Sequence, residues 1–477
     1  MKIKLTIILF TVFGLATYAQ AKKWTLQECV NYALENNITI KQTELDLQTA
    51  EINKNDAIGN FLPNLSGRAS HSWNIGLNQN ITTGLLENLT TQFSSVGING
   101  GIDIYNGLQN INRLHRSNLA ILASQYQLDN IKDDISLLVA NSFLQVLFSK
   151  EQLKVLAVQN IVSNEELKRT EELVEAGVLP RGDLLEIQAT LATQEQQIVN
   201  AENSIALAKI NLAQILLIDD YQNFDIADIS YDVPLTNILD ESPETIIAKA
   251  KETRKDIQIA ETNAEISERD LKISRGALQP SLSGFYSYST RASYSDIIVG
   301  SVLNASNPTR VIGTVEGTGQ NVIVPNFDPI IERPNATFDQ FSVNDGHNFG
   351  LQLSVPVFNG FALRNNVKRS KVNLERSKIQ LEQANLDLES NVYQAFNDTK
   401  GAQKAYEASI KTVTARKEAF TYSQERYNVG LLNAFDFNQS RTQLETAESD
   451  LIRAKYDYIF KLKVLEYYFG IPIANLN

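Results

Sequence analysis

The sequence predicts a mainly α-helical protein in which long coiled-coil hairpins are combined with membrane β-strands, and the whole arrangement is duplicated. One observation is that residues 108–176 contain neither Gly nor Pro. Such a stretch permits a single helix on the order of 105 Å long. The other observations are short segments with alternating apolar and polar residues, and a second half that repeats the order of elements in the first.

Composition narrows the classes of protein that the chain can belong to. The 477 residues include only 11 Pro and 23 Gly, as expected of a chain dominated by long helices. The formal net charge of −12 argues against nucleic acid as a partner. The single cysteine, Cys29, excludes a disulfide within the chain and is not in the small-residue context of a lipid attachment site.

No combination of residues marks a catalytic, cofactor-binding or metal site. The three histidines lack the spacing of metal ligands, and the chain contains neither a phosphate-binding glycine loop nor a nucleophile elbow. The many Asp and Glu residues of the helices are interpreted as solvated helix faces. We therefore predict that the protein is not an enzyme and uses no cofactor.

The N-terminal residues 1–21 have the form of a secretory signal peptide. Lys2 and Lys4 precede an apolar run over residues 5–15, and small residues follow, with cleavage expected after Ala19 or Ala21. An uncleaved anchor is the alternative, which the short apolar run disfavours. Beyond this segment no apolar run is long enough to cross a bilayer as a helix.

The first structural repeat is predicted to cover residues 22–241. A capping box formed by Thr25 and Glu28 begins its first helix, which is expected to run to about Ala57. Two strands, the long helix and a second helix follow. The predicted bounds are 64–78 and 94–105 for the strands, 108–176 and 184–216 for the helices, and 177–183 for the tip between these helices.

This tip combines a signal that ends one helix with a signal that begins the next. Gly177 supplies the left-handed residue that closes a last helical turn, and Asp183 is a preferred N-cap residue. With long helical patterns on both sides, the two helices are expected to form an antiparallel hairpin. Seven-residue spacing of Leu184, Leu191 and Ile198 in the second helix is typical of a coiled coil.

The second repeat is predicted to cover residues 242–477. Its first part matches the first repeat at an offset of 217 residues, and its later part matches at an offset of 253. The difference of 36 residues indicates an insertion within residues 295–346, which we expect to be an outer loop. The predicted bounds are about 281–294 and 347–358 for the strands and 430–436 for the tip.

The four predicted strands have the length and the two-faced character of transmembrane β-strands. A bilayer does not tolerate an open sheet edge, and four strands cannot close a barrel around a lumen. Copies of the chain must therefore share one barrel, with eight strands for two chains or twelve for three. The alternative is a soluble sheet packed on its apolar face.

Several motifs, found in this order and in duplicate, resemble the TolC-like outer-membrane efflux proteins of Gram-negative bacteria. They are the opening segment 24–37 (WTLQECVNYALENN), the Leu62-Pro63-Asn64-Leu65 motif, the Asn-Gly pairs after Tyr105 and Phe358, and the segment 426–436 (RYNVGLLNAFD). The resemblance covers nearly the whole mature chain.

The resemblance implies a homotrimer in which each chain gives four strands to a twelve-stranded barrel in the lipid of the outer membrane. The helices would form an α-barrel in the periplasm. It also implies passive exit for the substrates of a tripartite efflux or type I secretion system. The implied partners are a periplasmic adaptor (membrane fusion protein) and an inner-membrane pump of the RND or ABC type. Drugs, metal ions, detergents and polypeptides all remain open as substrates.

The resemblance also assigns roles to residues of the two tips. The residues that match the adaptor-docking tips are Gly177, Val178, Leu179, Gly430, Leu431 and Leu432. The residues that match the gate of the family are Asp183, Tyr427 and Asp436. Leu432 stands where the family's gate has an arginine, and Gln439 stands where it has a further acid. Asp183 and Asp436 have the alternative interpretation of simple N-cap residues.

A secreted structural or adhesive coiled-coil protein is the main alternative function. The heptad spacing of the helices favours this alternative, whereas the four membrane-type strands argue against it.

Overall fold

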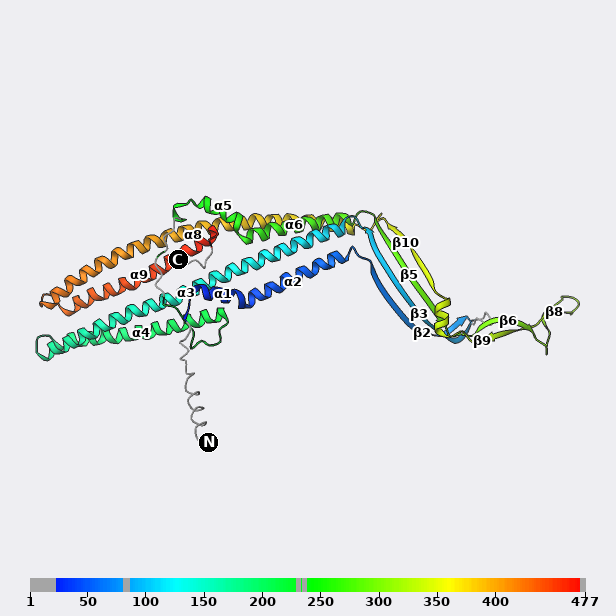
Figure 1. Cartoon of the computed structure of the whole chain (residues 1–477), viewed down its shortest axis with the longest axis horizontal. Helices are drawn as coiled ribbons and strands as arrows, with labels where there is room; N and C mark the ends of the chain where they lie inside the picture. The colour runs from blue at the N-terminus through cyan, green and yellow to red at the C-terminus, as the bar shows by residue number, and fades with distance from the viewer. Residues whose placement is uncertain (1–22, 80–85, 229–232, 234–237, 472–477) are drawn as a thin grey trace, which may run out of the picture. The chain divides into compact units, whose positions relative to one another are not determined.

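The computed structural model describes residues 23–79, 86–228, 233 and 238–471, so the predicted signal peptide lies outside the described residues. The chain divides into two compact units, and each unit takes segments from both halves of the sequence. The helical unit includes residues up to 51, 118–267 and the residues from 373 on. The sheet unit includes residues 52–117 and 268–372 (Figure 1).

Long helices account for most of the chain, and their bounds confirm the internal duplication. The helices of the first half are α1 (Leu26–Asn36), α2 (Ile38–Gly59), α3 (Gln109–Glu175) and α4 (Arg181–Leu216). The helices of the second half are α5 (Pro243–Thr253), α6 (Lys255–Gly276), α7 (Thr337–Val343), α8 (Ala362–Asn428) and α9 (Ala434–Phe469). A short 3-10 turn, η1 (Ile238–Asp240), precedes α5.

Equivalent helices begin and end at the same offsets as the sequence repeat. The bounds of α5 and α6 lie 217 residues after those of α1 and α2. The bounds of α8 and α9 lie 253 residues after those of α3 and α4. Among the described residues, no helix combines the length and the apolar content that crossing a bilayer requires.

The first helix predicted for each half is in fact two helices. The expectation of one helix from Thr25 to about Ala57 is wrong, because Asn37 adopts an extended conformation with ψ of 133° between α1 and α2. The Asn37 side chain accepts a hydrogen bond from the amide of Thr39 at 2.8 Å. Asn favours such local bonds over a continuous helix. Arg254, with ψ of 127°, makes the equivalent break between α5 and α6.

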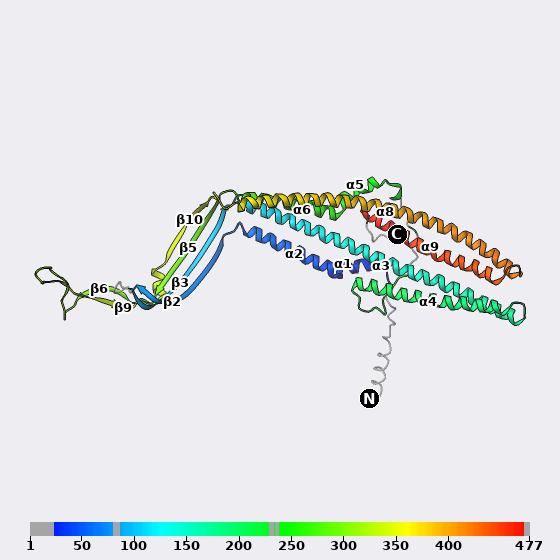
Figure 2. The same ribbon diagram turned by 180° about the vertical axis from the view of Figure 1, so that it is seen from behind.

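The helical unit has two apolar cores, and α9 contributes to both. One core surrounds Phe143 of α3 and includes Leu212 of α4 and Ile459 of α9. The other contains Val392 of α8 and Leu462 of α9, together with residues of α5. The hairpins α3–α4 and α8–α9 can be followed from both sides in Figures 1 and 2. Helix α9 therefore couples the two hairpins.

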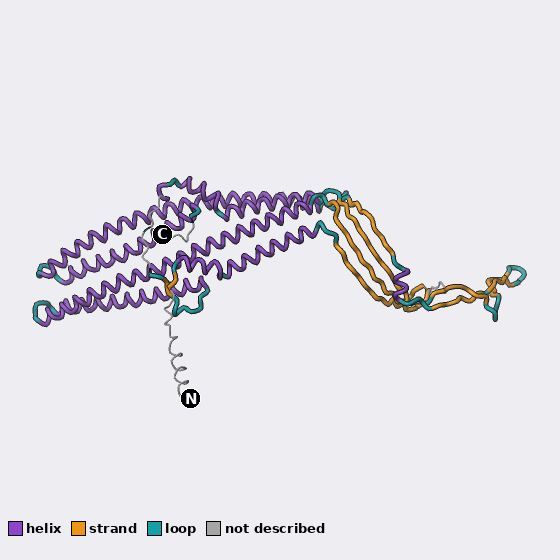
Figure 3. Tube along the Cα trace, viewed as in Figure 1, coloured by secondary structure: helices purple, strands orange, loops and turns teal. Residues whose placement is uncertain are grey.

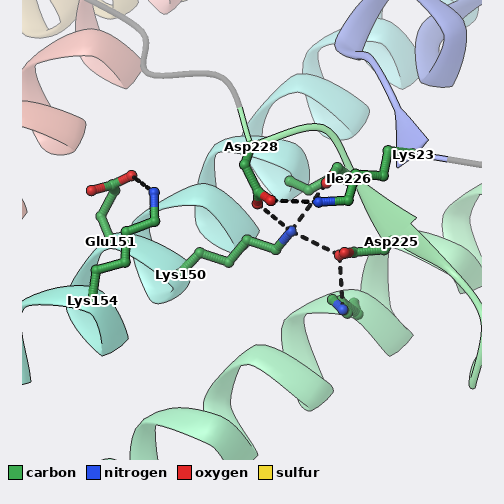
Figure 4. Close-up of polar contacts among 8 residues, drawn as sticks. Lys23, Lys150, Glu151, Lys154, Asp225, Ile226 and Asp228 are labelled. Atoms are coloured by element: carbon green, nitrogen blue, oxygen red, sulfur yellow. Dashed lines mark hydrogen bonds and ion pairs between the residues drawn. The ribbon is translucent and has the colours of Figure 1, made fainter. Parts of the chain in front are cut away.

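A small parallel sheet and a cluster of ion pairs fix the N-terminal strand to the helices. Strands β1 (Lys23–Trp24) and β4 (Asp225–Ile226) pair with each other. The ammonium group of Lys150 on α3 lies 2.8 Å from Asp225 and 2.7 Å from Asp228, and Lys23 lies 2.6 Å from Asp228 (Figure 4). The hydrogen bonds from Lys150 and Lys23 lower the pKa of Asp228 from 3.8 to about 2.

We predict that Lys150→Met lowers the thermal stability of the protein at neutral pH, by on the order of 1–3 kcal/mol, because two carboxylates lose a nearly buried partner. A carboxylate with a lowered pKa stabilises the folded state above its usual pKa and loses this effect as the pH falls through its folded pKa. The difference between variant and wild type should therefore shrink from pH 4 towards pH 2. Thermal unfolding of the purified protein across this pH range measures it.

Lys154→Met is the matched control, since Lys154 lies one turn further along α3 and pairs with Glu151 at the surface (Figure 4). This variant should unfold within a degree or two of wild type. Equal effects of the two substitutions would contradict the role assigned to Lys150.

The sheet unit contains one antiparallel sheet of four strands, ordered β10-β5-β3-β2. The strands are β2 (Asn64–Gln79), β3 (Leu86–Tyr105), β5 (Ser281–Ser293) and β10 (Gly346–Ser354). They appear together in orange in Figure 3. Within the described residues, β2 and β10 each have one edge without a neighbouring strand. Leu65, Ile98, Tyr286 and Phe349 share one face, as the register of the pairs shows.

Two predicted strand bounds need correction. The strand expected at 94–105 begins at Leu86, because it pairs with β2 as far as Gln79. The strand expected at 347–358 ends at Ser354. Pro356 follows shortly afterwards and has no amide hydrogen for a sheet ladder, which accounts for the early end.

The insertion, which we expected to be an outer loop, connects β5 to β10 and contains strands of its own. Its strands form two ribbons, β6 (Ile297–Leu303) with β9 (Phe327–Glu332) and β7 (Thr309–Thr314) with β8 (Asn321–Pro325). Helix α7 follows and packs against β5. The β-branched residues of the strands, such as Ile297 and Val311, favour this extended structure.

Candidate functional site: the two hairpin tips

The two tips have the same backbone structure at equivalent positions. At the first tip, Gly177 has φ of +71° and the amide of Val178 donates to the carbonyl of Leu173 at 2.8 Å. At the second tip, Gly430 has φ of +75° and the amide of Leu431 donates to the carbonyl of Arg426, also at 2.8 Å. A left-handed glycine with this long backward hydrogen bond is a Schellman motif. Figure 3 shows both tips as short loops.

The helices that leave the tips do not begin as predicted. Pro180 holds the N-cap position of α4, and Asn433 holds that of α9. Asp183 and Asp436 therefore lie in the first turn, and their interpretation as N-cap residues is wrong. The Asn433 side chain accepts from the amide of Asp436 at 2.8 Å and donates to its carboxylate at 3.0 Å. In the first turn, both carboxylates are placed favourably at the positive end of a helix dipole.

Apolar side chains stand exposed at the tips. Val178 is 66% exposed and Leu431 is 70% exposed, whereas Leu179 and Leu432 are half-buried. Val429 and Phe435 add to the exposed apolar surface of the second tip, and the sequence analysis did not single them out. Exposed apolar groups of this kind, set on a rigid turn, are suited to contact with another protein.

The three predicted gate residues have different surroundings in the structure. Tyr427 is half-buried and stacks on Phe437 with ring centroids 4.6 Å apart. Burial raises the pKa of Tyr427, and the nearby charges of Glu166 and Asp183 raise it further. Asp436 is exposed and bonded to Asn433 instead. Within one chain, the charge of Asp183 on α4 thus acts on Tyr427 of α8.

A buried arginine near the tips was missed by the sequence analysis. Arg441 of α9 is 3% exposed, and none of its three side-chain nitrogens has a hydrogen-bond partner among the described residues. Its Nε lies 3.9 Å from a carboxylate oxygen of Glu445, and its guanidinium carbon lies 5.9 Å from the ring centre of Phe437. Burial lowers the pKa of Arg441 and raises the pKa of Glu445.

These groups form a polar seam between the hairpins, defined here by Tyr427, Asn438, Arg441 and Glu445. The amide of Gln194 on α4 donates to Glu445 at 3.1 Å, which joins the two hairpins directly. Both amide atoms of Asn438 lack partners among the described residues. The burial of Arg441 could have been predicted from the helical period. Arg441 follows the buried Phe437 by four residues and therefore lies on the same face of α9.

We predict that Arg441→Met destabilises the protein, because it leaves the half-buried Glu445 without its positive neighbour, at a cost of about 3 kcal/mol. Glu445→Gln alone should also destabilise, since it leaves the arginine without its nearest carboxylate. The double variant should unfold closer to wild type than either single variant. Thermal unfolding of the four proteins completes the cycle. Additive single effects would show that Arg441 and Glu445 do not interact.

The paired long hairpins and the two-faced strands are the features that the resemblance to outer-membrane efflux proteins led us to expect. The family model described as outer membrane efflux protein matches residues 29–216 and 246–470 of the chain. The chain therefore belongs to this family, and it is an outer-membrane efflux channel whose helical part lies in the periplasm of a Gram-negative bacterium.

Solved structures of such channels share the fold at low sequence identity. The chain superimposes on CusC with a TM-score of 0.75 and 17% identity, covering 94% of this chain and 92% of CusC. For VceC of Vibrio cholerae the TM-score is 0.74 with 14% identity, covering 94% and 96% of the two chains. For the Campylobacter jejuni channel CmeC it is 0.73 with 16% identity, covering 93% and 85%. No curated protein sequence matched the chain.

Proposed function

We propose that three copies of this chain form a passive exit duct, which docks through its tips to a periplasmic adaptor and so serves an inner-membrane pump. The observation that carries this proposal is the internal symmetry of the chain. Several contacts join the second segment of one half to the first segment of the other half. The repeat predicts an equivalent set of contacts, but in a single chain the residues of that set do not meet. A neighbouring copy would supply them.

The strands support this proposal most directly. Within the chain, β3 pairs with β5, and Ile98 lies opposite Tyr288. Adding 253 to the residue numbers of β3 gives β10, and subtracting 217 from those of β5 gives β2. The outer edges of β10 and β2 are unpaired among the described residues. If two copies of the chain pair in the equivalent way, β10 of one copy pairs with β2 of the next. The same operation places Leu351 opposite His71 of a neighbouring copy. The two hairpins within the chain have the same register at these offsets. Asn64 of β2 pairs with Gly101 of β3, and the equivalent residues, Ser281 of β5 and Ser354 of β10, also pair.

A pair of glycines repeats the argument at the inner end of the sheet. A Cβ atom at Gly276 would lie 2.4 Å from the carbonyl oxygen of Gly107, so the two backbones touch within the chain. Their equivalents are Gly59 and Gly360. Around each of these, a Cβ atom would meet nothing within 4 Å in the described structure. A neighbouring copy bound in the equivalent way would bring Gly59 and Gly360 together.

The helices carry a matching pair of apolar stripes. Within the chain, α3 and α6 meet through polar contacts such as the 2.7 Å ion pair between Arg116 and Asp270. The equivalent helices α8 and α2 instead expose apolar residues at seven-residue spacing. The exposed residues, each more than half accessible, are Ile38, Leu45 and Ile52 on α2 and Val372, Ile379 and Leu386 on α8.

These two stripes interdigitate in the proposed assembly. The contact of Lys255 with the ring of Tyr126 becomes, at the offsets of the repeat, a contact of Ile38 with Ile379 of the neighbouring copy. Apolar residues thus replace a charged contact where two separate chains meet. Burying such exposed stripes is the usual driving force for long helices to associate.

The number of copies follows from the need for a lumen. Two copies would give an eight-stranded barrel, and side chains fill the interior of a barrel of that size. Three copies give twelve strands and leave an open centre. The face of the sheet opposite to Leu65 and Ile98 carries polar residues such as Ser66, Asn99 and Gln352, as expected of a water-filled lumen.

The tips are the proposed docking and gating region. The glycines Gly177 and Gly430 hold the turns, and Val178, Leu179, Leu431 and Leu432 provide the apolar surface for a periplasmic adaptor (membrane fusion protein). The pump would be of the RND or ABC type, and it would supply the energy for export. Asp183, Tyr427 and Asp436 are the proposed gate residues, of which exposed Asp436 is free to face a central axis.

We predict that cysteines at Leu351 and His71 in one chain cross-link neighbouring copies into a covalent trimer under mild oxidation. Residues directly opposite on antiparallel strands have Cα atoms about 4.5–5.5 Å apart, which suits a disulfide. The single native cysteine is buried and does not compete. Non-reducing electrophoresis of outer membranes is the readout, with cysteines at Leu351 and Arg68 as the control, because Arg68 is three residues away on the other face. A monomeric native mass in mild detergent would refute the trimer.

A second prediction concerns Gly59→Ala, which should reduce trimer assembly although the single chain has open space at this position. The added methyl group would clash with Gly360 of the neighbouring copy at a cost of about 1–3 kcal/mol per interface, or roughly tenfold in association. Gly401→Ala on α8 is the control, since its Cβ atom also meets nothing within 4 Å. Equal trimer yields for the two variants would contradict the proposed contact.

A third prediction concerns the gate. Asp436→Asn should weaken the block of the channel by divalent cations in planar bilayers, because three carboxylates around an axis attract cations. The asparagine keeps the side-chain size, and the cap from Asn433 uses the backbone amide, so the helix start is preserved. Asp450→Asn, further along α9 and exposed, is the control. Unchanged block would restrict Asp436 to a structural role at the start of α9.

A further inference from the structure

We propose that helix α7 of the insertion packs against the outer end of strand β2 of the neighbouring copy, and so fastens adjacent chains at the outer rim of the barrel. The inference rests on the trimer proposed above and adds a contact that the repeat does not supply, because the described residues of the first half contain no equivalent of this helix.

Helix α7 is held firmly on the outer end of β5. The Thr290 hydroxyl donates to the carbonyl of Phe341 at 2.8 Å. The side-chain amide of Gln340 bonds both the amide and the carbonyl of Ser293 at 2.9 Å. The side chain of Asn344 donates to the carbonyl of Arg291 at 2.8 Å. These four bonds fix the helix in position and direction.

The helix lies on the apolar face of the sheet. Thr290 is 5% exposed and Ala292 is fully buried at the place where α7 packs on β5. Both residues follow Tyr286 at even spacing along β5, so they share its face of the sheet. This is the face that carries Leu65 and Ile98 further along the sheet.

Two large apolar side chains of α7 are exposed, one on each flank of the side that does not face β5, and the polar residues Ser342 and Asp339 lie between them. Phe338 is 84% exposed and Val343 is 74% exposed, although both belong to a helix that is anchored by its other side. The ring of Phe338 contacts that of Phe341 edge to face at 6.2 Å, which limits its freedom. Two large apolar groups held in this way are prepared for a partner rather than for water.

The register of the proposed barrel places the neighbouring β2 close to α7. Phe93 pairs with Ser293 within the chain, so Gly346 would pair with Gly76 of the neighbouring copy. Strand β10 begins at Gly346, three residues after the end of α7 at Val343. Strand β2 continues past Gly76 to Gln79, beyond the reach of β10.

The end of β2 offers apolar side chains on the same face. Ile75 is 79% exposed and Leu77 is 64% exposed. Both have odd residue numbers in β2, as Leu65 has, so they lie on the same face of the strand as Leu65. This is also the face of the sheet that carries Tyr286. Neighbouring strands are about 4.8 Å apart, so the neighbouring β2 would run about 10 Å from β5, within the width of one helix. The exposed sides of α7 and β2 would therefore cover each other.

The test uses cysteines at Val343 and Leu77 in the full-length chain in outer membranes. Mild oxidation should give covalent dimers and trimers on a non-reducing gel. Cysteines at Val343 and Asn74 are the control, since Asn74 lies on the other face of β2 and should not link. The pair at Leu351 and His71 provides the reference for the barrel itself.

The outcomes separate the two proposals. Linking at the reference pair without linking at Val343 and Leu77 would overturn the contact of α7 and leave the trimer intact. Failure of both pairs would overturn the trimer as well. A fluorophore on a cysteine at Val343 that is quenched by spin-labelled lipids would show that α7 faces the bilayer, and this result would also overturn the contact.

A second variant tests the contact without cysteines. Phe338→Ser should lower the temperature at which the detergent-extracted trimer dissociates, because it removes the largest exposed apolar group of α7. Asp339→Asn, a neighbouring change on the same helix, should leave this temperature unchanged. Equal dissociation temperatures for wild type and Phe338→Ser would contradict the proposal.

Discussion

The backbone hydrogen bonds at the two open edges of the sheet determine the rest of the structure. An amide or carbonyl group that faces lipid without a partner costs several kcal/mol, so a bilayer excludes an open edge. Strands β2 and β10 end the sheet with such edges, while Leu65, Ile98 and Phe349 give it an apolar face. The proposed closure by further copies would satisfy both requirements at once, and the helices that continue from the strands would then meet their equivalents.

The helical unit combines firm and weak interactions in a way that suits a channel. Around Phe143 and Leu462 the cores are apolar and closely packed, and the ion pairs of Lys150 add to the first of them. Towards the tips the packing changes to the polar seam around Arg441, where buried groups lack full hydrogen bonding. A seam of this kind stabilises the hairpin contact less than an apolar one would. If a partner docks at the tips as proposed, this is the part of the helical unit where we expect it to move the hairpins most easily.

Much of this architecture could be predicted, because long helices and a duplication leave strong traces in a sequence. The absence of Gly and Pro located α3, and the repeat of its tip at Gly430 located the end of α8. Helix breaks and caps made by side chains were harder to predict. The break at Asn37 and the cap at Asn433 both depend on an Asn side chain that accepts a hydrogen bond from a nearby backbone amide. Arg441 was missed since a charged residue on an apolar face was not treated as a candidate. The ribbons of the insertion have no counterpart in the first half, so the repeat gave no information on them.

The contact between Gly107 and Gly276 has a consequence for inheritance as well as for folding. Gly107 and Gly276 come into contact when one chain folds. In the proposed trimer, the equivalent glycines, Gly59 and Gly360, come into contact only when different chains meet. In a cell that carries both a normal and an altered gene, a defect at Gly107 removes only its own product. A chain altered at Gly59 still folds and still offers its unaltered side to a normal neighbour. In a proposed ring of three it would spoil one junction of every mixed assembly it entered, so such an allele would be dominant over the normal one.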